Sequence, residues 1–267
     1  MRQYKYLEDF INELRSNGRY AFSLQELRNQ FKQSDEAIKK AIQRLKKKRE
    51  VALIRNGFYV IIPPEYRSKG SLPPSLFIAE LMKFLGKDYY VGLLNAAAYY
   101  GAAHQQPQSF SVIIMKPGLR NINDDNLKIN FYIKKEWDSN DIVQKKVDTG
   151  YINVSSPELT SLDLVYYFEH AGGLNRVATV LEELVENIDA NKLLDVVKRF
   201  SPITVIQRLG FLLEEILNIR NLSEPIKAYL QTLKYFPVLL SPQKEKSEMI
   251  TGNDWKVVQN VEIETDL

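Results

Sequence analysis

The residues of this sequence best suited to a chemical task are basic. Seven Lys or Arg residues fall within the eleven residues 39–49. Cationic side chains bind phosphates, and the amide of Gln43, inside the same run, can hydrogen-bond the edge of a base. The chemistry that this run could supply is therefore nucleic-acid recognition. Because lysine-rich helix faces are often only solvated surface, the elements around the run decide between the two interpretations.

The basic run lies in a helix that we expect at 35–48, with two distinct faces. Ser34 and Asp35 are residue types that cap a helix start. At about 100° per residue, an apolar stripe that should pack inward is formed by Ile38, Ala41, Ile42 and Leu45. We predict that the helix start and the opposite face contact DNA through Ser34, Glu36, Lys39, Lys40, Gln43, Arg44 and Lys47.

Two further helices are expected before the basic one. Over 4–14 the apolar residues Tyr6, Leu7, Phe10, Ile11 and Leu14 recur at spacings of three and four, which is typical of an amphipathic helix. A second helix should begin after Ser23. Glu26 follows three residues later and forms a capping-box pattern with this serine.

A β-hairpin is expected after the basic helix. The runs VALIR and FYVII are β-prone and are joined by Asn56 and Gly57, a dipeptide that favours a type I′ turn. Three helices followed by a hairpin are typical of a winged helix-turn-helix. In that fold the third helix enters the major groove and the hairpin tip, here Arg55 and Asn56, contacts the flanking backbone.

Charge is distributed unevenly along the chain. The net charge is +3, but residues 1–70 hold 16 basic and 8 acidic side chains, whereas the other 197 residues hold 20 and 25. A basic segment of this kind is the usual electrostatic footprint of a nucleic-acid binder. The charge distribution thus agrees with the prediction for the basic helix.

Composition excludes several classes of protein. The chain has no cysteine and only two histidines, so disulfides, thiolate metal sites and a cysteine nucleophile are excluded, and a histidine-rich metal site is not expected. The opening MRQYKYLEDF carries charges where a signal peptide has its apolar segment, and no apolar run of membrane-spanning length is present. We expect a soluble, cytoplasmic protein that contacts no membrane, contains no metal and needs no cofactor.

The rest of the chain predicts a larger mixed domain. Two pairs of prolines and Gly70 mark 63–75 as a linker between a domain at 1–62 and one at 76–267. A helix is expected at 76–86, and another within 89–107 that ends at Gly101. Short strands are expected at 109–115, 126–135, 143–148 and 151–156. Apolar stripes then predict helices from Ser156 to about residue 217, and residues 255–263 could add a late strand. The predicted fold class is α+β, with a small sheet and a C-terminal group of helices.

Two rival interpretations stay open. A metal-dependent nuclease needs clustered carboxylates followed at short spacing by lysine, and its nearest approach here is Asp124 and Asp125 before a strand that ends at Lys134 and Lys135. Such a pair more often forms a turn. His104 lacks a partner for catalysis or metal binding nearby in the sequence. The other rival is a protein-interaction adaptor whose basic helix is merely solvated. We expect a non-enzymatic protein.

The order of these parts resembles the AbiEi family, the antitoxin-regulators of type IV toxin–antitoxin systems. The segments that carry the resemblance are NGFYVIIPPEY, GSLPPSLFIAELM, YYVGLLNAAAYYGAAHQQP and SSPELTSLDLVYYFEHAGGLNRVATVL. The third segment is the most distinctive, and the resemblance covers residues 1–190.

The resemblance implies a function and a division of labour. An AbiEi protein binds inverted repeats in its own promoter as a repressor, and it opposes a nucleotidyltransferase-like toxin without forming a stable complex with it. By motif position, DNA contact belongs to the helix at 35–48 and to the hairpin tip at 55–57, and antitoxicity belongs to the second domain. An inverted repeat is bound by two DNA-binding domains, so we expect a monomer at each half-site or a weak dimer.

Overall fold

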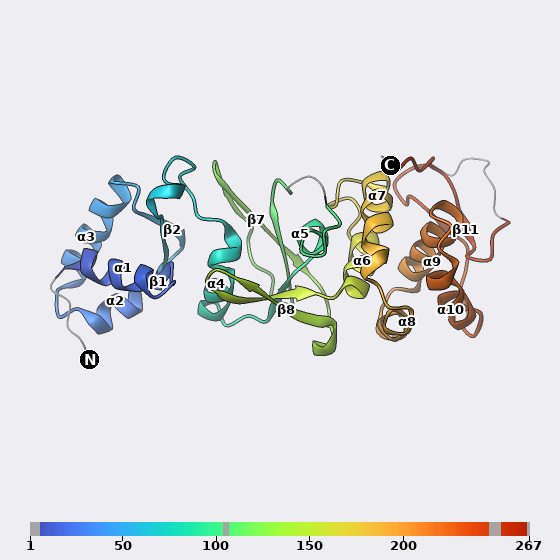
Figure 1. Cartoon of the computed structure of the whole chain (residues 1–267), viewed down its shortest axis with the longest axis horizontal. Helices are drawn as coiled ribbons and strands as arrows, with labels where there is room; N and C mark the ends of the chain where they lie inside the picture. The colour runs from blue at the N-terminus through green and yellow to red at the C-terminus, as the bar shows by residue number, and fades with distance from the viewer. Residues whose placement is uncertain (1–5, 104–106, 246–251, 266–267) are drawn as a thin grey trace. The chain divides into compact units, whose positions relative to one another are not determined.

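The computed structural model describes residues 6–103, 107–245 and 252–265. The fold is of the α+β class, with helices and sheets in one chain (Figure 1). Contacts between Cα atoms divide the chain into two compact units. Unit 1 comprises Met1–Tyr90, Gln108–Glu136 and Gln144–Asn153, and unit 2 comprises Val91–Pro107, Trp137–Val143 and Val154–Leu267.

Unit 1 begins with three helices and a three-stranded sheet, which we call the head. In chain order its elements are α1 (Leu7–Ser16), β1 (Ala21–Ser23), α2 (Leu24–Gln30), α3 (Asp35–Lys47), β2 (Val51–Arg55) and β3 (Phe58–Ile61). The strands are ordered β1-β3-β2, and both pairings are antiparallel. Strand β1 was not expected, because three residues are too few to show an alternating pattern.

The core of the head is built by the predicted apolar stripes. Leu7, Phe10, Ile11 and Leu14 of α1 are buried with Phe22, and the Phe10 and Phe22 rings meet edge to face at 6.2 Å. The expectation for Tyr6 was wrong: it occupies the N-cap position and is 57% exposed. A residue that precedes the first helical turn does not follow the periodicity of the buried face.

Two predicted helix caps are present. The Glu26 backbone N–H donates to Ser23 Oγ at 3.1 Å, and the Ser23 N–H donates to Glu26 Oε2 at 2.8 Å. These reciprocal bonds satisfy two donors that the start of α2 would otherwise leave unpaired. At α3 the Ala37 N–H donates to Ser34 Oγ at 3.3 Å.

The expected hairpin connects β2 and β3, but its turn is not type I′. A type I′ turn needs positive φ at both central residues. Here Gly57 has φ +80°, whereas Asn56 is not among the residues with positive φ. The register also shifts between Leu53 and Arg55. An irregularity that places glycine in the left-handed region is a frequent alternative for closing a short hairpin.

The proline-rich segment 63–75 packs within unit 1. It contains two 3₁₀ turns, Pro64–Tyr66 and Pro74–Leu76, and Leu72 is only 1% exposed. The Ser71 hydroxyl donates to the Asn126 carbonyl at 2.7 Å. Residues on both sides of this segment belong to unit 1, and the domain boundary at 63–75 stays a prediction.

A six-stranded sheet follows, with strand order β6-β7-β5-β4-β9-β8. Its strands are β4 (Tyr89–Val91), β5 (Phe110–Ile114), β6 (Ile122–Asp124), β7 (Leu127–Ile133), β8 (Ile142–Val147) and β9 (Gly150–Ser155). Strands β5 and β7 pair in parallel, and β6 and β7 pair antiparallel. All four predicted strand regions are confirmed, and β4 and β6 are additional.

Two short helices accompany these strands. They are α4 (Ile78–Phe84) and α5 (Leu93–Ala98). Helix α4 confirms the prediction for 76–86. The helix predicted at 89–107 is partly wrong, because its first residues form β4 with all three side chains buried. A short apolar run has no periodicity that separates a buried strand from a buried helix.

Unit 2 is rich in helices. Its larger helices are α6 (Pro157–Tyr166), α7 (Leu174–Leu184), α8 (Ala190–Arg199), α9 (Ile203–Phe211) and α10 (Arg220–Gln231). Helix α6 starts at the predicted serine cap, where the Leu159 N–H donates to Ser156 Oγ at 3.2 Å. Helix α9 continues into a π-helical turn at Leu212–Ile216. Helix α10 was not predicted from the sequence, because Pro225 lies inside it.

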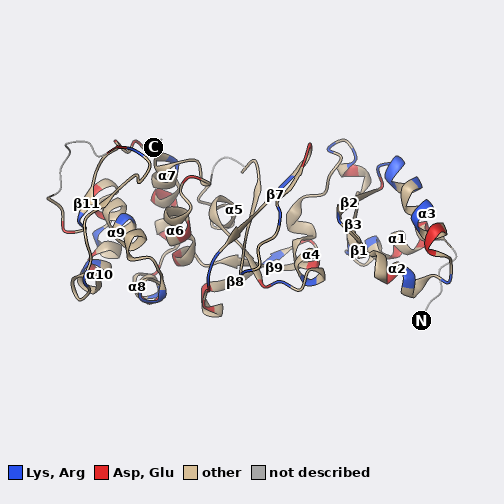
Figure 2. Ribbon diagram, turned by 180° about the vertical axis from the view of Figure 1, so that it is seen from behind, with Lys and Arg blue, Asp and Glu red and all other residues tan. Residues whose placement is uncertain are grey.

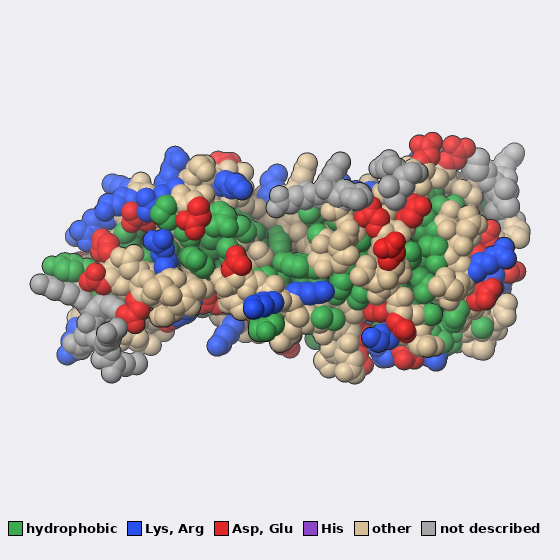
Figure 3. All heavy atoms as spheres, viewed as in Figure 1, with side chains coloured by type: hydrophobic (Ala, Val, Ile, Leu, Met, Phe, Trp, Pro, Cys, Tyr) green, Lys and Arg blue, Asp and Glu red, His purple; other side chains and the backbone are tan. Residues whose placement is uncertain are grey.

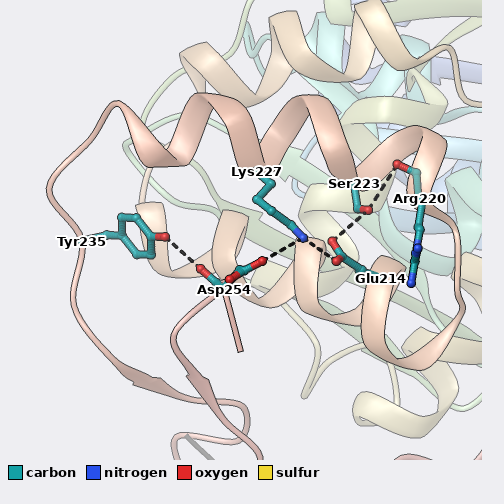
Figure 4. Close-up of polar contacts among 6 residues, drawn as sticks. All are labelled: Glu214, Arg220, Ser223, Lys227, Tyr235 and Asp254. Carbon is teal, nitrogen blue, oxygen red and sulfur yellow. Dashed lines mark hydrogen bonds and ion pairs between the residues drawn. The ribbon is translucent and has the colours of Figure 1, made fainter. Parts of the chain in front are cut away.

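The C-terminal segment is held against these helices by one large side chain and a polar cluster. Strands β10 (Val238–Leu239) and β11 (Val257–Val258) pair in parallel, so the predicted late strand is confirmed over two residues. Trp255 is fully buried against Gly210 of α9. Lys227 forms a short ion pair with Glu214 and one of 3.2 Å with Asp254 (Figure 4).

Candidate nucleic-acid interface

Helix α3 has the two faces that its sequence predicts. Ile38, Ile42 and Leu45 are only 3%, 3% and 1% exposed, and they belong to the core of the head. Ala41 is partly buried against the same core. Packing of this stripe fixes the rotation of the helix about its axis, so it also decides which side chains face the solvent.

The predicted contact face of α3 is exposed along its whole length. Every side chain predicted to contact DNA from within the helix is exposed, namely Glu36, Lys39, Lys40, Gln43, Arg44 and Lys47. Acidic residues occupy the first turn and basic residues dominate the remainder (Figure 2). Lys and Arg side chains gather over this helix at the left of the space-filling view (Figure 3). The face is a cationic surface that contains one amide.

The start of α3 is fixed by Ser34 and Asp35, and only the cap at Ser34 was predicted from the sequence. Ser34 accepts the Ala37 N–H, so its hydroxyl acts as a helix cap. Asp35 is paired with Arg28 of α2 through two hydrogen bonds of 3.0 Å and 2.5 Å. These bonds lower the pKa of the Asp35 carboxyl below its ordinary value. The pair offsets the charge of an acid at the edge of the cationic face and links α2 to α3.

The two hairpin-tip residues lie in different environments. Asn56 is exposed in the turn. Arg55 is half-buried, its guanidinium lies 5.6 Å from the centre of the Phe131 ring, and its Nη2 forms a short hydrogen bond to the Arg120 carbonyl. The structure therefore joins Arg55 to β7 and to the loop that precedes β6. Nothing in the sequence pattern linked these distant residues.

Arg19 joins the head to α4 within unit 1. Its guanidinium contacts Glu26 at 2.7 Å and Glu80 at 2.6 Å. Burial raises the pKa of Glu80 above its ordinary value, although Arg19 opposes this. Burial also acts to raise the pKa of Glu26, but the hydrogen bonds from Arg19 and the Ser23 backbone lower it instead. A second contact joins the same elements, because the Phe58 and Phe84 rings lie 5.3 Å apart.

The carboxylates considered for a nuclease site form a turn. The Asp125 N–H donates to Asp124 Oδ1 at 2.8 Å, and both side chains are exposed. Within the described ranges, no group of three or more His, Cys, Asp or Glu side chains is arranged to hold a metal ion. His104 lies outside the described residues. His170 is exposed just after α6.

Sequence reasoning missed the residues that position this interface. Arg28 and Asp35 are seven positions apart, and their pairing across the turn between α2 and α3 is one signal that could have been read. The contacts of Arg19 with Glu80 and of Arg55 with Arg120 join residues 61 and 65 positions apart. Such pairs can be found only once the chain is folded.

Comparison with known proteins identifies one family and one related fold. Residues 90–215 match the family model described as the AbiEi antitoxin C-terminal domain, which confirms the resemblance over that range. The crystal structure of protein RV2827C from Mycobacterium tuberculosis is similar with a TM-score of 0.70 at 14% sequence identity, covering 97% of this chain and 93% of that chain. This likeness shows a shared fold. No curated protein matches the chain. Among the described helices, none is long and apolar enough to cross a membrane.

Proposed function

Residues 90–215 match the AbiEi antitoxin C-terminal domain, and from this premise we propose that the chain is an antitoxin that also represses its own promoter. The family match supports the antitoxin role. The DNA-binding role is carried by one observation, the exposed cationic face of α3. The protein binds double-stranded DNA in the cytoplasm and acts without a catalytic step or a cofactor.

In this proposal the head is a winged helix-turn-helix. Helix α3 enters the major groove, where its cations bind phosphates and Gln43 hydrogen-bonds a base edge. The hairpin of β2 and β3 is the wing, and Arg55 and Asn56 contact the flanking backbone. The element order α1, β1, α2, α3, β2, β3 and the antiparallel sheet support this assignment.

The operator is an inverted repeat, and each half-site takes one copy of the protein. A symmetric operator is bound by two DNA-binding domains, which come from two monomers or from a weak dimer. The toxin that the protein opposes is nucleotidyltransferase-like. Antitoxicity belongs to the domain at 76–267, which contains the matched residues 90–215, and it needs no stable complex with the toxin.

The DNA-binding role is tested by fluorescence anisotropy with a labelled duplex from directly upstream of the gene. The test variant reverses three charges on α3 (Lys40→Glu, Arg44→Glu, Lys47→Glu), and the control reverses three exposed charges in unit 2 (Lys192→Glu, Arg220→Glu, Lys244→Glu). Both variants change the net charge equally. We expect the wild type and the control to bind the duplex selectively, and the α3 variant to lose this binding.

Salt dependence identifies phosphate contacts in the same experiment. Each phosphate contact contributes about −0.9 to the slope of log Kobs against log salt concentration, so a steep slope is expected. If the duplex is bound no better than a scrambled one, or if the α3 variant binds as well as the control, the repressor role is wrong. The basic run would then be a solvated face of an interaction adaptor.

The antitoxin role has a separate test. Expression of this chain together with a nucleotidyltransferase-like toxin should restore the growth that the toxin arrests. The α3 charge-reversal variant should restore growth equally well, because its substitutions lie outside the domain at 76–267. Failure of the wild type to restore growth would contradict the antitoxin role and leave the DNA-binding role untouched.

A further inference from the structure

The loop at 115–121, between β5 and β6, gathers basic side chains from three parts of unit 1. The loop itself carries Lys116 and Arg120, both exposed. Lys87 donates to the Pro117 carbonyl at 2.8 Å. Arg55, from the hairpin tip, donates to the Arg120 carbonyl. Four cations from the loop, from the turn after α4 and from the hairpin thus occupy one short stretch of surface.

None of these cations is paired with an acid in the part of the chain that the structure describes. Among the described residues, no carboxylate is ion-paired or hydrogen-bonded with Lys87, Lys116 or Arg120, or with the guanidinium of Arg55. Other basic residues of unit 1 form ion pairs with carboxylates, as Arg19 does with Glu26. A group of like charges without a counter-ion repels itself, and binding an anion relieves the repulsion.

The guanidinium of Arg55 has unsatisfied hydrogen-bonding groups. Its Nε is buried and has no hydrogen-bond partner. Burial, and in second place the nearby Arg120 charge, lower the pKa of the Arg55 guanidinium below its ordinary value. A guanidinium presents several N–H groups in a planar fork that matches phosphate oxygens. Among the described residues, the bond to the Arg120 carbonyl is the only hydrogen bond of this guanidinium, so most of its N–H groups are unused.

We infer that the 115–121 loop and Arg55 form a binding site for backbone phosphates of nucleic acid, outside the contacts of α3. The inference rests on the proposed function in taking DNA as the ligand. Lys116 and Arg120 lie on open surface, where single anions are held weakly but a polymer presents several phosphates at once. Arg55 ends β2 and contacts the loop, so the site is continuous with the hairpin that the proposed function assigns to DNA.

The test compares two neutralising double variants of the full chain. Lys116→Gln with Arg120→Gln removes two charges from the loop and keeps the backbone carbonyl that Arg55 contacts, and Lys192→Gln with Lys244→Gln removes two exposed charges from unit 2. Each protein is titrated with the labelled upstream duplex and with a scrambled duplex of equal length over a salt series. Circular dichroism and the unfolding midpoint establish that the variants are folded.

The loop variant should bind both duplexes several-fold more weakly, and its salt slope should be less negative by about 1 for each phosphate that the loop no longer binds. The preference for the upstream duplex should stay unchanged, because backbone contacts do not read sequence. The control should behave as the wild type. A loop variant with wild-type affinity and slope on both duplexes would overturn the inference.

Two further outcomes separate this inference from the proposed function and from a free anion. If charge reversal on α3 leaves binding intact while the loop variant weakens it, the proposed reading helix is wrong and the phosphate site stands. If inorganic phosphate, at constant ionic strength, raises the unfolding midpoint of the wild type and control but not of the loop variant, and DNA affinity is unaffected by the substitutions, the site holds free anions. That result would overturn the assignment to nucleic acid.

Discussion

At the scale of single residues, neighbours in the sequence perform different tasks. Ser34 caps α3, Asp35 pairs with Arg28, and Glu36 is exposed. In unit 2 the absence of a side chain matters, because Gly210 leaves room for the indole of Trp255. Trp255 lies outside the matched residues 90–215. The C-terminal segment thus completes the packing of the family domain.

Replacing Gly210 with alanine should destabilise the protein by about 1–3 kcal/mol, the usual range for overpacking. The added methyl carbon would lie 1.9 Å from Trp255 Cζ3, so the ring or α9 has to move. The measurement is the free energy of unfolding in urea. Gly252→Ala is the matched control, because a methyl group there has no neighbour within 4 Å. Equal stability of the two variants would show that Trp255 packs elsewhere.

At the scale of elements, α3 places structural and exposed side chains at adjacent positions. Ile42 is buried in the core of the head, and Gln43 is exposed on the cationic face. The same helix therefore contributes to stability through one face and to the proposed DNA contact through the other. A matched pair of substitutions can separate the two contributions.

Ile42→Ala should lower the free energy of unfolding by about 2–5 kcal/mol, because it leaves a cavity in the core. Gln43→Ala should change it by less than about 0.5 kcal/mol. In DNA binding the effect should instead come from Gln43→Ala, which should lose about 1–3 kcal/mol of the preference for the upstream duplex over a scrambled duplex. Unfolding in urea and anisotropy titration measure the two quantities. An unchanged preference would remove Gln43 from base recognition.

At the scale of the whole molecule, the compact units do not coincide with the order of the chain. Unit 1 contains residues 1–90 and the later segments 108–136 and 144–153. Unit 2 contains the segments 91–107, 137–143 and 154–267. The head contacts later residues of unit 1 through Arg19 with Glu80 and Phe58 with Phe84. These contacts bear directly on the predicted domain boundary at 63–75.

A fragment of residues 1–62 should be less stable than a fragment of residues 1–90 by about 1–2 kcal/mol. The shorter fragment lacks the aromatic contact with Phe84, for which about 0.5–1.5 kcal/mol is typical, and a partly exposed ion pair adds up to about 1 kcal/mol. Urea unfolding followed by circular dichroism measures the difference. If both fragments are equally stable, the head is an independent domain and the predicted boundary is right.

Elements with local signals could be predicted from the sequence alone. The cap residues Ser23 and Ser34, the apolar stripe of α3 and the four longer strand regions were predicted correctly because each depends on residues a few positions apart. The exposed face of α3 follows from the same periodicity. Elements with weak or misleading local signals were missed, such as the three-residue β1 and the proline-containing α10.

Contacts between residues far apart in the chain became visible only in the folded protein. Three contacts join segments that are far apart in the chain. Arg55 lies beside Arg120 and Phe131, Arg19 pairs with Glu80, and Trp255 packs against Gly210. Such contacts depend on how whole elements pack, and packing is set by the fit of many side chains at once. A local pattern does not encode that fit, so the exposed face of α3 could be predicted from the sequence, whereas the group of cations around 115–121 could not.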